Sequence, residues 1–187
     1  MNDYYSITAP AKLNLNLFVK GKANNGLHLL ESDVCFLELA DRIYFKFSEN
    51  DDFLQTNTNK SFLVDSKQNL ILESLNSFRY LTGWHKKFKI YLNKNIPIGA
   101  GLGGGSADAA ATLILLRKLF NKETKAEKIS ISSLYEIANK LGSDVSACLE
   151  SKSLKISGYG NKIRRNKLSN NYYYLLVKPN IQLSTKE

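Results

Sequence analysis

One stretch decides the fold: IPIGAGLGGGSADAAATLILLRKLF, residues 96–120. Five of the chain's 11 glycines lie between Gly99 and Gly105. Because glycine has no Cβ, the backbone here can adopt positive φ and approach a ligand closely. Apolar residues then recur at helical spacing, which predicts a helix directly after the glycines: Ala109, Leu113, Leu116 and Phe120. The amides and dipole at a helix N-terminus favour phosphate, so the stretch predicts a site for the phosphates of a nucleotide.

Two common phosphate loops do not fit this stretch. A Walker A loop ends in Gly-Lys-Ser/Thr, whereas Gly105-Ser106-Ala107 contains no lysine. A dinucleotide-binding fingerprint can be placed on Gly99, Gly101 and Gly104, but it needs a buried strand before it and a second strand after the helix. Residues 88–92 alternate apolar and polar side chains, and residues 121–125 do not resemble a strand.

The rest of the chain predicts strands and helices without regular alternation, so we expect an α+β fold. Period-two patterns predict strands at 7–19, 34–39, 42–47, 88–92, 154–157 and 172–177. Helical spacing predicts one helix around Ile71–Leu81, ended by Gly83, and another around Ile131–Leu141, ended by Gly142. Polar residues 20–26 predict a turn, and residues 49–60 and 162–167 predict loops.

Composition limits the class of protein. The 187 residues carry a formal net charge of +9, which attracts anions but serves solubility equally well. Neither Cys35 nor Cys148 belongs to a CxxC pair, so a disulfide framework or zinc site is not expected. There is no signal-peptide pattern and no stretch of membrane-spanning length, so we expect a cytoplasmic protein without a membrane partner.

The glycine stretch resembles the phosphate loop of the GHMP kinases, in which Pro, Gly-Leu-Gly-Gly-Gly-Ser and small residues lead into a helix. The resemblance implies a GHMP kinase N-terminal domain, akin to the ribosomal S5 domain 2-like fold, and ATP with Mg²⁺ as co-substrate. It also implies a set of ATP-binding residues: Pro97, Gly99, Ala100, Gly101, Leu102, Gly103, Gly104, Gly105, Ser106, Ala107, Asp108 and Ala109.

Three further segments resemble one GHMP family, the 4-diphosphocytidyl-2-C-methyl-D-erythritol kinases. They are residues 9–15 (APAKLNL), residues 25–28 (NGLH) and residues 141–146 (LGSDVS). The family has an aromatic residue where Leu27 stands here. Its chains are longer and end in a second domain, so the resemblance implies an N-terminal domain at 1–168 and the start of a second α+β domain at 169–187. On this interpretation the chain is either a fragment or a shortened product.

The resemblance also implies roles for single residues. Lys12 would stabilise the reacting hydroxyl and the transferred phosphoryl group, and Asp144, held near it, would act as the base. Asn14 and His28 would bind the substrate, with His28 at its cytidine part. Taken alone, a strand lysine, a turn aspartate or a turn histidine is usually uninvolved. No carboxylate cluster in the sequence suggests a dedicated metal site, so Mg²⁺ is expected to enter with ATP.

Other functions remain open at this point. Mevalonate or homoserine kinase is the alternative within the GHMP kinases, and an inactive nucleotide-binding homologue is another. An RNA-binding module would also be compatible with the charge, but the chain lacks a basic stripe interleaved with aromatic residues, and we expect no nucleic-acid partner. The sequence does not fix the oligomeric state and leaves a homodimer open.

Overall fold

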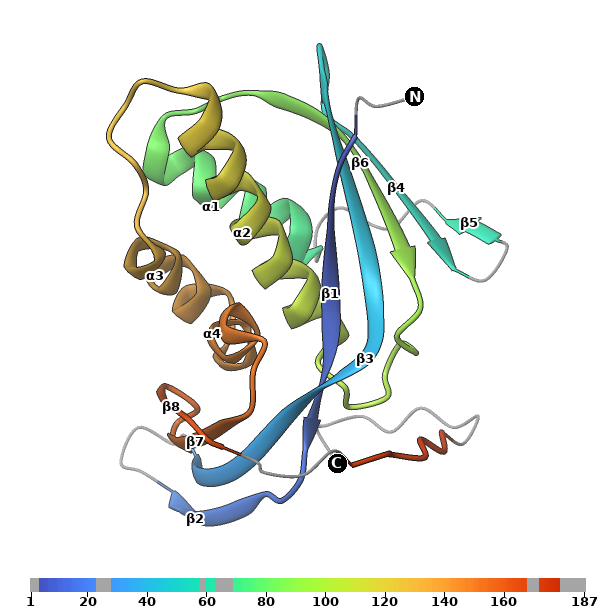
Figure 1. The fold of residues 1–187 in the computed structure, drawn as a ribbon, viewed down its shortest axis with the longest axis vertical. Coiled ribbons are helices and arrows are strands. Elements are labelled where there is room, and N and C mark those ends of the chain that lie inside the picture. Colours follow the sequence, from blue (N-terminus) through green and yellow to red (C-terminus); the bar gives the residue numbers. More distant parts are fainter. Residues whose placement is uncertain (1–3, 23–27, 58–59, 63–68, 168–171, 179–187) are drawn as a thin grey trace.

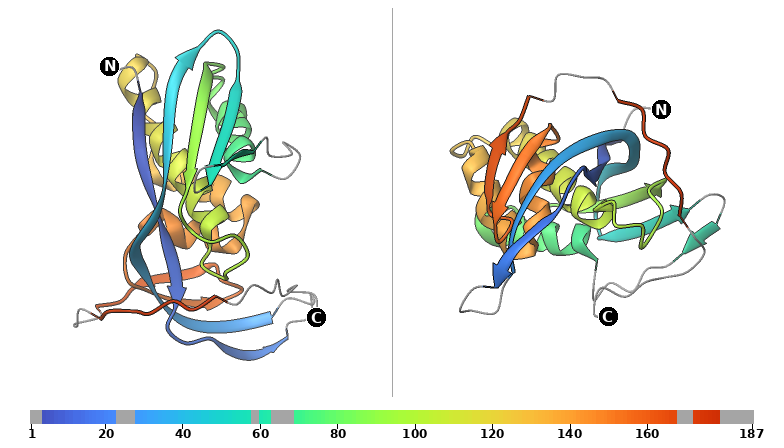
Figure 2. Two further views of the ribbon diagram at one scale, coloured as in Figure 1. Left: turned by 90° about the vertical axis from the view of Figure 1, so that its right-hand side faces the viewer. Right: turned by 90° about the horizontal axis from the view of Figure 1, so that it is seen from below.

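The computed structural model describes residues 4–22, 28–57, 60–62, 69–167 and 172–178. These form an eight-stranded sheet with four helices on one face (Figures 1 and 2). The strands are β1 (Tyr5–Asn14), β2 (Phe18–Lys22), β3 (His28–Ser48), β4 (Asp52–Asn57), β5 (Lys60–Phe62), β6 (Lys87–Lys94), β7 (Leu154–Gly158) and β8 (Lys162–Arg165). The helices are α1 (Leu70–Thr82), α2 (Gly104–Glu123), α3 (Ile131–Leu141) and α4 (Ser143–Glu150). The expected α+β fold is confirmed.

The 21-residue strand β3 organises the sheet. Antiparallel β1 and β2 pair with it, and β6 and β7 pair with its opposite ends at residues 42–48 and 30–34. The sheet continues from β6 to β4 and β5, and from β7 to β8. A register shift between Pro10 and Lys12 marks a bulge where β1 crosses the middle of β3.

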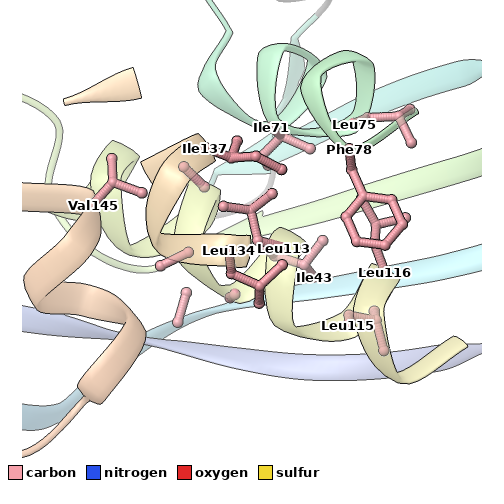
Figure 3. Close-up of a cluster of buried hydrophobic side chains, with 14 of the residues drawn as sticks. Ile43, Ile71, Leu75, Phe78, Leu113, Leu115, Leu116, Leu134, Ile137 and Val145 are labelled. Carbon is pink, nitrogen blue, oxygen red and sulfur yellow. The ribbon is translucent and has the colours of Figure 1, made fainter. Parts of the chain in front are cut away.

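A single large core joins the sheet to the helices. Ile43, Phe45, Phe88 and Ile90 supply its sheet side, and α2 lies in its middle between α1, α3 and α4. Figure 3 shows Leu113 and Leu116 of α2 among side chains of the neighbouring helices and β3. The predicted buried face of α2 is confirmed, because Ala109, Leu113, Leu116 and Phe120 are all buried.

The residues at its two ends explain the bounds of α1, and the predicted end at Gly83 is confirmed. Asn69 caps α1 by accepting a hydrogen bond from the amide of Ile71 at 2.9 Å. Gly83 closes α1 in the left-handed conformation, at φ 66°. Gly142 follows α3 as expected, but with a backbone outside the left-handed region, and a short helix that the sequence did not predict, α4, starts at Ser143.

Several predictions of strands and loops need correction, all because pairing between strands overrides local pattern. The strand predicted at 7–19 ends at Asn14, and the chain resumes pairing only at Phe18, which extends β2 into the predicted turn. The two strands predicted at 34–39 and 42–47 are one continuous strand, β3, because β1 pairs along both. The predicted loop at 49–60 contains β4, which pairs in parallel with β6. The predicted basic loop at 162–167 contains β8, which pairs with β7.

The strand predicted at Tyr172–Val177 is wrong as well. Among the described residues no strand pairs with this segment, so residues 172–178 have no regular secondary structure. Their exposure still alternates: Tyr172, Tyr174 and Leu176 are 57%, 39% and 40% exposed, whereas Tyr173, Leu175 and Val177 are 101%, 91% and 82% exposed. Residues 172–174 and Leu176 line a cavity with residues 35–39 of β3. The period-two pattern therefore indicates an extended segment lying against β3. The remainder of 169–187 lies outside the described residues.

Candidate functional site

The glycine loop between β6 and α2 has a backbone that suits an anion. Gly99, Gly101 and Gly103 all have positive φ, at 70°, 71° and 63°, which other residues adopt only under strain. Gly103 is the N-cap of α2, where no side chain caps the helix and the first turn has no acidic residue. The first amides of a 20-residue helix therefore lack the usual partners, which is the arrangement that binds phosphate.

A cavity of about 500 Å³ lies over this loop. Most of the predicted ATP-binding residues line it: Pro97, Gly99 through Ser106, and Asp108. Ala107 and Ala109 do not, because they face the core from the other side of α2 and are 1% and 0% exposed. The cavity is also lined by residues that the sequence did not single out: Gln55, Asn69, Leu70, Ile71, Leu92, Lys94 and Ile98.

Lys12 and Asp144, 132 positions apart in the chain, form an ion pair beside the loop. Lys12 Nζ lies 2.9 Å from Asp144 Oδ1, and the lysine side chain is 5% exposed against 42% for the aspartate. The loop touches this pair, since a Cβ on Gly103 would lie 3.3 Å from Lys12 Cβ and 3.9 Å from Asp144 Oδ2. In addition, the Lys12 amide donates to the Leu102 carbonyl at 2.9 Å. The phosphate loop therefore contacts the ion pair through Leu102 and Gly103, although neither Lys12 nor Asp144 lines the cavity itself.

Local structure explains how these two side chains meet. The bulge in the β1–β3 pairing lies immediately before Lys12, and bulges redirect side chains. Ala11 and Lys12, which are consecutive, are both buried at this point of the strand. Asp144 is the second residue of α4, where the positive end of the helix dipole stabilises a carboxylate.

Of the two predicted substrate-binding residues, Asn14 lies on β1 with Lys12, and His28 is the first residue of β3. Lys12 Nζ donates to Asn14 Oδ1 at 3.0 Å, and Asn14 Nδ2 donates to Ser32 Oγ at 2.8 Å. Ser32 Oγ in turn donates to the carbonyl of Asn16 at 2.5 Å. Polar groups thus run without interruption from Lys12 to β3. His28 begins β3, is exposed, and pairs in register with Lys22; the rest of its predicted turn, residues 25–27, lies outside the described residues.

The sequence reasoning missed a buried ion triplet: Asp41 on β3, Lys94 on β6 and Asp108 on α2. Lys94 Nζ lies 2.5 Å from Asp41 Oδ2 and 2.7 Å from Asp108 Oδ2. The period-two pattern of β6 could have indicated that Lys94 is buried. Phe88, Ile90 and Leu92 fill the inward positions of β6, and Lys94 occupies the next one.

The pKa values of the triplet follow from its burial. Burial raises the pKa of Asp108 to about 7, and the Asp41 carboxylate adds to the rise while Lys94 opposes it. Burial alone would lower the pKa of Lys94, but Asp108 and Asp41 outweigh it, so the pKa is raised. On α4, burial and the Asp144 carboxylate raise the pKa of the Cys148 thiol to about 12. That thiol is therefore a neutral packing group.

Neither a metal centre nor a membrane-spanning helix is found among the described residues. No three His, Cys, Asp or Glu side chains among them are grouped as metal ligands. None of the described helices is long and apolar enough to cross a membrane.

Comparison with known proteins identifies the domain. Residues 69–152, which include α1, the glycine loop and α4, match the family described as the GHMP kinases N terminal domain. The chain contains a GHMP kinase N-terminal domain. Solved structures agree with this assignment: a crystal structure of a 4-(cytidine 5'-diphospho)-2C-methyl-D-erythritol kinase superimposes with a TM-score of 0.69 at 29% identity, over 87% of this chain and 55% of that one.

Sequence relatives confirm the closer resemblance. The 4-diphosphocytidyl-2-C-methyl-D-erythritol kinase of Enterococcus faecalis is 37% identical over 95% of this chain, and that of Shewanella piezotolerans is 36% identical over 96%. The chain spans about 60% of the length of these relatives. The mevalonate kinase of Methanococcus jannaschii shares the fold of this GHMP kinase domain, with a TM-score of 0.63 at 19% identity.

Proposed function

We propose that this GHMP kinase domain belongs to an enzyme that transfers the γ-phosphoryl group of ATP to a hydroxyl of 4-diphosphocytidyl-2-C-methyl-D-erythritol. The reaction would serve isoprenoid precursor synthesis in the cytoplasm. The observation that carries the proposal is the contact between phosphate loop and ion pair, because Gly103 lies against both Lys12 and Asp144. The names of the sequence relatives support this substrate over mevalonate or homoserine.

Each part of the site has a role in this reaction. The glycine loop and the first turn of α2 bind the phosphates of ATP. Asp144 accepts the proton of the attacking hydroxyl, and its partly exposed side chain leaves room for the acceptor. Lys12, buried and held by Asp144 and Asn14, stabilises the charge that develops on the hydroxyl and phosphoryl oxygens. Lys12 thereby compensates for the weak basicity of a carboxylate.

The roles of Asn14, His28 and Mg²⁺ follow from the resemblance to the kinase family. Asn14 would position the acceptor, because its side chain is fixed between Lys12 and Ser32. His28 would bind the cytidine part from the start of β3. Mg²⁺ would reach the site on the phosphates of ATP, where it neutralises their charge. Residues 1–168 would form the nucleotide-binding domain, with 169–187 starting a second one.

A substrate comparison tests the proposal. The purified protein is assayed for ADP release with Mg·ATP and one acceptor at a time: 4-diphosphocytidyl-2-C-methyl-D-erythritol, mevalonate or homoserine. We expect release only with the first, and inhibition by CDP that is competitive with it. Turnover of mevalonate or homoserine without inhibition by CDP would assign the domain to another GHMP kinase. ATP binding without turnover of any acceptor would show that these 187 residues bind the nucleotide but do not by themselves catalyse the transfer, as in an inactive homologue or a piece of a longer enzyme.

A further inference from the structure

The ion triplet lies directly beneath the proposed phosphate site. A Cβ placed on Gly104, the first residue of α2, would lie 3.0 Å from Lys94 Nζ, so the ammonium group contacts the backbone that starts the helix. Lys94 and Asp108 also line the cavity over the loop. All three members are buried: Asp41 is 0%, Asp108 3% and Lys94 7% exposed. Any charge on the triplet therefore acts on the loop through protein rather than through water.

The charges of the triplet do not balance. Two carboxylates face one ammonium, which leaves one excess negative charge if all three groups are ionised. Such a charge is costly to bury, and it repels an anion bound at the loop above it. A proton on one carboxylate removes both effects.

The hydrogen bonds of the two carboxylates show which one takes the proton. Asp41 is fully engaged as an acceptor: Oδ1 receives the amides of Asn95 at 2.6 Å and Ile96 at 2.8 Å, and Oδ2 receives Lys94. Asp108 accepts one bond from Lys94 through Oδ2, whereas its Oδ1 is buried without a hydrogen-bond partner among the described residues. Both oxygens of Asp41 therefore accept hydrogen bonds, whereas Asp108 has one oxygen that accepts none.

We propose that Asp108 couples nucleotide binding to proton uptake, because an anion bound at the glycine loop draws a proton onto the Asp108 carboxylate. Asp41 and Lys94 hold the Asp108 side chain in place beneath the loop. The proposal rests on the proposed function, because it takes the loop to be the ATP phosphate site. Asp108 is a positioning residue in this scheme and does not touch the reacting atoms. ATP then binds more tightly at lower pH, since the protonated triplet is neutral.

The surroundings of Asp108 support this assignment. The titratable or charged groups that interact with it from the elements packed on it are Lys94 of β6, Asp41 of β3 and Cys148 of α4. Lys94 stays charged and the Cys148 thiol stays neutral near pH 7, given their raised pKa values. The pKa of Asp108 itself, raised to about 7 by burial, puts its titration in the range where binding is measured.

Calorimetry tests the coupling on the purified protein with Mg·ATP. Titrations at about pH 7.5–8 in buffers of different ionisation enthalpy give the number of protons taken up. The terminal phosphate is by then essentially ionised, since phosphate groups have a pKa of about 6. We expect the wild type to take up a fraction of a proton, and its affinity to fall about sixfold between pH 6.5 and 8.5, within the tenfold limit that a one-unit pKa shift on binding sets. Asp108→Asn should bind ATP without this uptake, and the exposed control Glu127→Gln should behave as the wild type.

The outcomes separate the two proposals. ATP binding by the wild type without proton uptake would overturn the role of Asp108 and leave the kinase assignment standing. Uptake that persists in a folded Asp108→Asn protein would also overturn it, because the proton would then sit elsewhere. If Asp108→Asn does not fold, the number of protons that the wild type takes up on binding ATP at about pH 7.5–8 decides whether binding is coupled to proton uptake. No ATP binding at all would refute the proposed function, and the coupling with it.

Discussion

Replacing Gly103 with alanine should reduce turnover by more than its effect on stability explains. Gly103 has φ 63°, so any other residue there is strained by about 1–2 kcal/mol. The new Cβ would also lie 3.3 Å from Lys12 Cβ and 3.4 Å from Lys12 Cε, closer than side chains normally pack. Lys12 must therefore move by a few tenths of an ångström. Because a misplacement of about 1 Å costs about a hundredfold in rate, we expect kcat to fall about tenfold.

Gly83→Ala is the matched control. Gly83 has nearly the same backbone conformation, φ 66°, but a Cβ there meets nothing within 4 Å, and it lies at the end of α1 away from the ion pair. Both variants should lower the melting temperature by about 2–8 °C, the effect of about 1–2 kcal/mol in a chain of this size. ADP release and thermal unfolding measure the two quantities. Equal kcat values for the two variants would show that Gly103 does not position Lys12.

Four further outcomes follow from the structure. Asp144→Asn should lower kcat by at least about a hundredfold, the scale for losing a general base, with little change in ATP affinity; near-normal ADP release would remove Asp144 from the mechanism. Gly104→Val should weaken ATP binding in calorimetry, because its Cβ would lie 3.0 Å from Lys94 Nζ; unchanged affinity in a folded protein would contradict the phosphate site. The folded protein holds the Asp108 proton more tightly than the unfolded chain, since burial raises the pKa from 3.8 to about 7. The wild type should therefore lose stability as pH rises from about 4 to about 7, by up to about 1.4 kcal/mol per pH unit. Asp108→Asn should lack that slope in denaturant titrations at several pH values, and equal slopes in the two proteins would argue against a raised pKa of Asp108. Leu113→Ala, at a fully buried position of α2, should cost about 2–5 kcal/mol in urea unfolding, and a loss near zero would mean that the core lies elsewhere.

Features encoded by neighbouring residues were predictable from the sequence. The glycine loop and α2 follow from the spacing of glycines and apolar side chains, and α1 follows from its period and from Gly83. The position of Lys12 and Asp144 in one site came from resemblance alone, since 132 residues separate them and no local pattern relates them. The structure places them together because α4 packs on α2, which contacts β1.

Features created by pairing between distant segments were not predictable in the same way. The polar stretch 52–57 has no strand pattern of its own and becomes β4 only because β6 offers an edge to it. Asp41 lies in the gap between the strands predicted at 34–39 and 42–47. In the structure its side chain points inward from β3, and Lys94 of another strand forms an ion pair with it. A buried charge of this kind becomes interpretable only when its partner is known.

The length of β3 also affects how the protein is made on the ribosome. The N-terminal part of β3, residues 30–34, pairs with β7. The ribosome adds roughly a hundred residues between the end of β3 and the start of β7. At about 5–20 residues per second, that stretch of synthesis takes about 5–20 s. For this interval the nascent chain carries a β3 edge without its native partner, and unpaired edges invite pairing with other chains. Chaperone contacts during translation are therefore expected at residues 30–34, before Leu154 has left the exit tunnel.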